Sequence, residues 1–94
     1  MFKKEDLQCL DRKYFEILQE SGYHITMESN LTGHIWDIAW RENPTGKSFV
    51  ISHKHKASDP FHLQPRMHPK TVEEAQEMIK DHDRWVLKKK KNKK

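Results

Sequence analysis

Apolar residues near the start of the chain recur at the spacing of one helical face. Between Lys4 and Glu20, charged side chains separate apolar positions that lie three or four residues apart, a pattern typical of an amphipathic helix. Gly22 follows, and glycine commonly ends a helix because it tolerates the left-handed conformation. The pattern predicts a helix over residues 4–20, with an apolar stripe formed by Leu7, Leu10, Tyr14, Ile17 and Leu18.

After Gly22 the period changes to two, which is the pattern of half-buried strands. Apolar and polar side chains alternate over residues 23–29, 34–41 and 47–55. A turn sequence, Asn43-Pro44-Thr45-Gly46, separates the last two segments, because proline presets the first turn position and glycine takes the positive φ that closes the turn. We expect an antiparallel meander with its core centred on Trp36, Ile38 and Trp40.

The pairing of the second and third strands follows from their side-chain faces. A shift by one residue would move every side chain to the other face and would split the apolar set. The register that keeps the apolar residues together places Trp40 opposite Ile51, Ile38 opposite His53 and Trp36 opposite His55.

The last third of the chain reads as a loop followed by a helix. Pro60, Pro65 and Pro69 exclude a continuous helix over residues 56–69, where residues 61–63 could form a short fourth strand. Thr71 and Glu74 have the spacing of a capping box, in which the two side chains satisfy amide groups at a helix start. The predicted buried stripe of this helix is Val72, Ala75, Met78, Ile79, His82, Trp85 and Val86.

Together these elements predict an α+β fold: a helix, a three-stranded antiparallel β-meander, a long loop and a C-terminal helix, with both helices on one face of the sheet. Ninety-four residues suffice for one small domain, which we assign to residues 1–87, followed by a disordered or helix-extending lysine tail over residues 88–94. No stretch reaches the roughly 20 apolar residues of a membrane span. The single cysteine, Cys9, cannot form an internal disulfide, so we expect a cytoplasmic protein.

Positive charge is concentrated in two segments. Residues 47–70 contain five basic residues and one acid, and residues 88–94 contain six lysines and no acid, whereas acids outnumber basic residues elsewhere. Cationic side chains beside an aromatic ring could bind nucleic acid through phosphate contacts and base stacking. We therefore expect a non-catalytic binding module that favours nucleic acid and uses the lysine tail together with Lys54, Lys56, Phe61, His62, Arg66 and Lys70.

A protein partner is the alternative to nucleic acid. The same proline-stiffened loop could serve an inhibitor or adaptor of the kind that phages and mobile elements encode, since a stiff loop loses little conformational entropy on binding. Its anchors would be large apolar and cationic side chains: Phe61, Leu63, Arg66 and Met67. The sequence also leaves the oligomeric state undecided, because an unpaired edge strand can pair with a second copy to form a homodimer.

Seven histidines raise the question of a metal site. His53 and His55 alternate on one strand face, so two imidazoles could reach one ion, with His62, His68 or Asp59 as further ligands. In the competing interpretation, the histidines are structural residues at a sheet edge or belong to a loop that titrates near neutral pH. We expect no cofactor. The chain has neither a glycine-rich phosphate loop nor a nucleophile with a positioned base, so we expect no enzymatic activity.

The predicted order of one helix, three strands and one helix resembles the double-stranded RNA-binding domain. Gly33-His34 before the second strand and Lys70 before Ala75 fall near that family's turn histidine and basic helix start. The chain departs from the family at Glu73 and Glu74, where the family places lysines, and in the length of its last loop. The resemblance implies a similar architecture.

Overall fold

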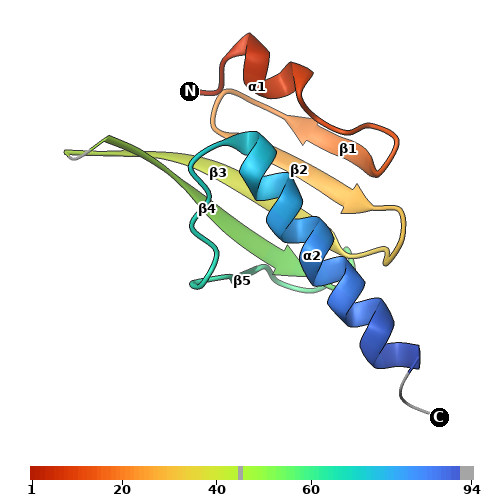
Figure 1. Cartoon of the computed structure of the whole chain (residues 1–94). Coiled ribbons are helices and arrows are strands. Elements are labelled where there is room, and N and C mark those ends of the chain that lie inside the picture. Colours follow the sequence, from red (N-terminus) through yellow and green to blue (C-terminus); the bar gives the residue numbers. More distant parts are fainter. Residues whose placement is uncertain (45, 92–94) are drawn as a thin grey trace.

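The computed structural model describes residues 1–44 and 46–91 and contains one antiparallel sheet and two helices (Figure 1). The α+β class predicted from the sequence is confirmed, but the sheet has five strands in the order β1-β2-β3-β4-β5. The helix α2 lies across one face of the sheet, and α1 lies near β1 (Figure 1). The elements are α1 Lys4–Gln8, β1 Phe15–Glu20, β2 His24–Ser29, β3 Ile35–Asn43, β4 Gly46–Lys54, β5 His62–Leu63 and α2 Val72–Lys91.

The predicted helix over residues 4–20 is wrong beyond Gln8. The Asp11 carboxylate accepts hydrogen bonds from the backbone N–H groups of Lys13 and Tyr14, a local turn that competes with continued helix. Phe15 then begins β1 and is fully buried opposite Ser29 of β2. Phe15 is not part of the predicted helical stripe, and its burial follows from the pairing of β1 with β2.

The predicted faces of β3 and β4 are correct, but their register differs by two residues. Asn43 pairs with Gly46, which has φ +132°, so the hairpin turn is tighter than predicted. A shift by two residues keeps every side chain on its face. The observed pairs are Trp36 with His53, Ile38 with Ile51 and Trp40 with Phe49. His55 therefore lies beyond Trp36 and near His34.

The core lies between the sheet and α2. Trp36 and Ile38 are fully buried and Trp40 nearly so, as predicted, and Val72 and Ile79 of α2 pack in the same cluster. The N-terminal segment closes one end of the core, where Phe2, Trp40 and Phe49 make ring contacts with centroids 5.3–5.6 Å apart.

The helix α2 begins as predicted, and of its predicted buried stripe only Trp85 is exposed. The Thr71 hydroxyl accepts a 3.0 Å hydrogen bond from the Glu74 N–H, which is one half of the predicted capping box. Trp85, assigned to the buried stripe, is 57% exposed. The C-terminal end of α2 extends past the sheet (Figure 1). Two polar side chains, Gln76 and Asp83, are buried instead.

Two further expectations concern the whole chain. The order of elements contains five strands, so it differs from the helix, three strands and helix of the double-stranded RNA-binding domain, although the two-residue strand β5 falls where a short edge strand was predicted. Within residues 1–44 and 46–91, no helix is long and apolar enough to cross a membrane. Residues 92–94 of the predicted lysine tail lie outside the described residues.

Candidate functional site

The structure brings two of the six predicted binding residues into contact. The Lys54 ammonium lies 4.3 Å from the centre of the Phe61 ring and donates a 3.1 Å hydrogen bond to the Ala57 carbonyl. Phe61 is 40% exposed, and Lys56 is exposed in the connection between β4 and β5. A stacking ring with cations beside it is therefore available at the end of β4.

The other three predicted residues lie apart from this pair. His62 of β5 pairs with His53 of β4, so its side chain is on the sheet face covered by α2. Arg66 and Lys70 are exposed in the segment from β5 to the start of α2, which follows the β4 edge of the sheet (Figure 1). The predicted basic loop is thus a strip along one edge rather than one compact patch.

Sequence reasoning missed a second exposed ring with a lysine beside it. The Lys89 ammonium lies 4.9 Å from the centre of the Trp85 ring, and Lys88 is exposed beside it in α2. Trp85 fitted the apolar period of the helix, so the sequence assigned it to the core. Its exposure depends on where α2 leaves the sheet, which no local pattern encodes.

A histidine cluster lies at the end of the covered sheet face. The Nε2 of His53 is 3.0 Å from the Nδ1 of His34, and the His55 ring stacks on His34 with centroids 4.3 Å apart. One ring nitrogen from each of these three residues lies within 4.8 Å of the others. His34 and His53 are buried, and His55 is exposed. Among the described residues, this is the group of side chains best placed to hold a metal ion.

Two further rings close the histidine cluster on its inner side. His53 stacks on Trp36 with centroids 4.0 Å apart, and His82 of α2 lies 5.1 Å from both rings. Within the described residues, the Nε1 of Trp36 and the Nδ1 of His82 are buried without a hydrogen-bond partner. An unpaired buried polar atom is costly, so these two nitrogens mark a site where a further ligand would be stabilising.

Burial and the neighbouring imidazoles favour the neutral form of His53. Burial, followed by the positive charge that His34, His82, His55 and His62 would carry, lowers the pKa of His53 from 6.5 to about 4. Burial also lowers the pKa of His82, against the opposing effect of the Asp83 charge. A neutral imidazole has a free lone pair, which is the form that binds a metal.

The sequence anticipated part of this cluster. His53 and His55 were the predicted metal candidates because they alternate on one strand face. His34 was missed as a ligand because it belongs to the turn before β3, and His82 because it was read as a core residue. The two-residue shift in register, which brings His55 near His34, could not be read from the faces alone.

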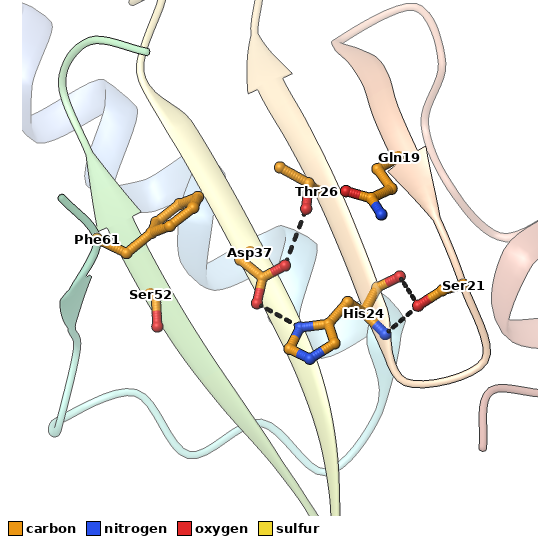
Figure 2. A pocket seen from close by; sticks show the side chains of 7 residues that line it. All are labelled: Gln19, Ser21, His24, Thr26, Asp37, Ser52 and Phe61. Atoms are coloured by element: carbon orange, nitrogen blue, oxygen red, sulfur yellow. Dashed lines mark hydrogen bonds and ion pairs between the residues drawn. The ribbon is translucent and has the colours of Figure 1, made fainter. Parts of the chain in front are cut away.

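The opposite, uncovered sheet face holds a shallow pocket of about 310 Å³. Figure 2 shows Asp37 at its centre, where the carboxylate accepts a 2.9 Å hydrogen bond from the Thr26 hydroxyl and lies 2.9 Å from the Nδ1 of His24. An imidazole held by a carboxylate can act as a general base. The Ser21 hydroxyl bonds to the backbone of His24 rather than to its ring, so it is not positioned as a nucleophile for that base. The pocket is lined by Gln19, Ser21, His24, Thr26, Asp37, Ser52 and Phe61.

A buried carboxylate fixes α2 against the sheet beside the histidine cluster. Asp83 is fully buried and accepts hydrogen bonds from the hydroxyls of Tyr14, Ser29 and Thr32. Burial and the Asp83 carboxylate raise the pKa of Tyr14 to about 12. Thr32 also accepts a hydrogen bond from the His34 N–H, so the carboxylate is linked to the backbone of a cluster histidine.

Comparison of the chain with models of known protein families, with curated proteins and with solved structures finds no match.

Proposed function

We propose that the protein is a non-catalytic nucleic-acid-binding module that uses one end of the molecule, the basic end, formed by Lys54, Lys56, Phe61, Trp85, Lys88 and Lys89. The observation that carries the proposal is the repeated pairing of an exposed aromatic ring with a lysine, Phe61 with Lys54 and Trp85 with Lys89. Single-stranded nucleic acid is bound by this combination, because rings stack on bases and ammonium groups contact phosphates.

The two ring–lysine pairs lie at the same end of the sheet. His82, three residues before Trp85, is in ring contact with His53 of β4, the residue before Lys54. The C-terminal end of β4 therefore lies close to the part of α2 that precedes Trp85. Phe61 lies on the uncovered sheet face and Trp85 on α2, so a flexible strand of nucleic acid that contacts both rings would pass around this end of the sheet.

The charge of α2 is divided along its length in a way that favours this end. Glu73, Glu74, Glu77 and Asp81 lie in its first half, whereas the residues after Asp83 include Arg84, Lys88 and Lys89 and no acid. Arg84 forms an ion pair with Asp81, which offsets the charge of the exposed acid nearest the basic end. Phosphate would be repelled from the start of α2 and attracted to its end.

Unpaired bases are the expected targets. Each lysine now lies over its ring, and it would move to a phosphate when a base takes its place on the ring face. The predicted residues His62, Arg66 and Lys70 lie off the basic end, so they would add a general electrostatic attraction to a longer strand rather than a stacking contact.

Fluorescence anisotropy with labelled single-stranded RNA and DNA of about 20 nucleotides at low salt tests the proposal. Phe61→Ala and Trp85→Ala should each weaken binding by roughly 5- to 150-fold, the equivalent of about 1–3 kcal/mol per stacked base. Tyr23→Ala is the matched control, because Tyr23 is 54% exposed and lies near the opposite end of the sheet. The proposal would be rejected if the wild-type protein showed no detectable binding to single-stranded RNA, to single-stranded DNA or to duplexes.

A protein partner has one observation in its favour. Leu63 is 66% exposed and, with Phe49 and Met67, lines a shallow groove of about 230 Å³ along β4. Exposed apolar side chains beside a sheet edge are typical of surfaces that receive another chain. Capture of partners from a cell extract, by wild-type protein and by a Leu63→Asp variant, distinguishes a protein partner from nucleic acid. The inhibitor or adaptor function is favoured if wild type captures a protein that the variant does not and if no nucleic acid binds.

A further inference from the structure

We propose that His34, His53 and His55 bind a Zn²⁺ ion through one ring nitrogen each. The inference rests on the geometry of the histidine cluster and is independent of nucleic-acid binding. Three histidines are a known zinc ligand set, and they leave a fourth position for water or another ligand.

The distances in the cluster are close to those a zinc site needs. With zinc–nitrogen bonds of about 2.0–2.1 Å, two ligands of a tetrahedral ion lie about 3.3 Å apart. The Nε2 of His53 and the Nδ1 of His34 are 3.0 Å apart, so this pair needs only a small outward movement. One ring nitrogen of each histidine lies within 4.8 Å of the other two, so the donors must approach by at most about 1.5 Å to reach tetrahedral spacing.

Two of the ligands are held in place before any ion binds. The His34 N–H donates to the Thr32 hydroxyl and the His34 carbonyl accepts from the Ser29 N–H, which fixes the backbone at this position. The His53 ring stacks on the buried Trp36 ring in the middle of the sheet. Preorganised ligands reduce the entropy lost on binding.

His55 is the ligand that has to move. Its ring is parallel to that of His34, with an angle of 9° between the planes. A metal ion lies in the plane of each imidazole that binds it, so two parallel stacked rings cannot share an ion until one of them turns. His55 is exposed and lies beyond the last paired residues of β3 and β4, so its side chain can turn at little cost.

Zinc would replace the proton that His34 and His53 now share. One of the two rings donates and the other accepts in their hydrogen bond, and both must offer a lone pair to the ion. The donor ring therefore changes tautomer on binding: its proton moves, by exchange with water, to its other ring nitrogen, and the neutral rings bind the ion without net release of a proton. The site contains only nitrogen donors, so Zn²⁺ is favoured over Mg²⁺ and Ca²⁺, which prefer oxygen.

Isothermal titration of the full chain, prepared without a histidine tag, with Zn²⁺ tests the site. We expect one Zn²⁺ per chain, no heat with Mg²⁺, and a higher melting temperature with Zn²⁺ because the ion binds the folded form. Co²⁺ should give the intense visible absorption of a four-coordinate complex. His55→Ala should weaken Zn²⁺ binding by roughly tenfold or more, since loss of a ligand costs at least as much as loss of its outer-shell partner.

His68→Ala is the matched control, because His68 is exposed and lies in the segment after β5. It should leave the Zn²⁺ affinity unchanged. Circular dichroism checks that His55→Ala folds, and His34→Gln provides a second ligand variant with a similar expected loss. Absence of Zn²⁺ binding by the wild-type protein would overturn the proposal, and so would equal affinities of wild type, His55→Ala and His34→Gln. Neither result would bear on nucleic-acid binding, which is measured without zinc.

Discussion

The Tyr14 hydroxyl donates a 2.7 Å hydrogen bond to the Asp83 carboxylate, which joins the start of β1 to the middle of α2. Ser29 and Thr32 donate to the same carboxylate, so one buried acid connects α2 to β1, β2 and the turn before β3. A buried carboxylate persists only where donors compensate for its lost hydration. This contact orients α2 and therefore determines where His82 and Trp85 lie.

Removing the buried carboxylate should destabilise the fold strongly. Asp83→Ala leaves three hydroxyl donors without their acceptor and opens a cavity, so we expect a loss of about 2–4 kcal/mol in the free energy of unfolding. Urea denaturation followed by circular dichroism measures it. Asp81→Ala is the control, because Asp81 is exposed and only pairs with Arg84, and should change stability by less than about 1 kcal/mol. Equal losses in the two variants would contradict the role given to Asp83.

Tyr14 should ionise at unusually high pH. Its pKa is raised to about 12 because the ring is partly buried and its hydroxyl donates to the Asp83 carboxylate. The folded-state pKa lies above the ordinary value of 10, so this contribution to stability is complete below pH 10 and is lost as the pH rises toward 12. The ultraviolet absorbance difference between wild type and Tyr14→Phe isolates the titration. A midpoint near 10 would show that the hydrogen bond does not form in solution.

Acid should weaken the metal-free fold through His53. Its pKa is lowered to about 4, so between pH 6.5 and about 4 the unfolded state binds a proton that the folded state does not. Stability therefore falls as the pH is lowered through this window. We expect an effect of about 1–3 kcal/mol, after allowance for solvent screening of the exposed part of the cluster. Chemical denaturation at several pH values, with a chelator present, should show a flatter profile for His53→Gln than for wild type, whereas His68→Gln should resemble wild type.

The two tryptophans Trp36 and Trp85 should respond differently to truncation. Trp36 is fully buried between the sheet and α2, so Trp36→Ala should cost roughly 3–5 kcal/mol. Trp85→Ala should cost less than about 1 kcal/mol, because its ring is 57% exposed. Thermal or urea denaturation of both variants compares them directly. A large loss for Trp85→Ala would mean that α2 packs in solution along the stripe that its sequence predicts.

The limits of the sequence are clearest at β1 and at the histidine cluster. Apolar residues from Leu7 to Leu18 fit one helical face, yet the chain from Phe15 pairs with β2, because burial of Phe15 against the sheet outweighs local helix preference. His34 and His55 are 21 positions apart and meet only because the β3–β4 register brings them together. Neither outcome depends on nearby residues alone.

The sequence by itself determined the features that depend on neighbours along the chain: the alternating faces of β2, β3 and β4, the turn before Gly46, and the start of α2 at the Thr71 cap. Period, turn chemistry and capping act over a few residues, so they can be read directly. The tertiary structure decided the register of β4, the packing angle of α2 and the exposure of Trp85. It also assembled the three-histidine site, because these features depend on long-range packing and on one buried acid, Asp83, whose partners lie far away in the sequence.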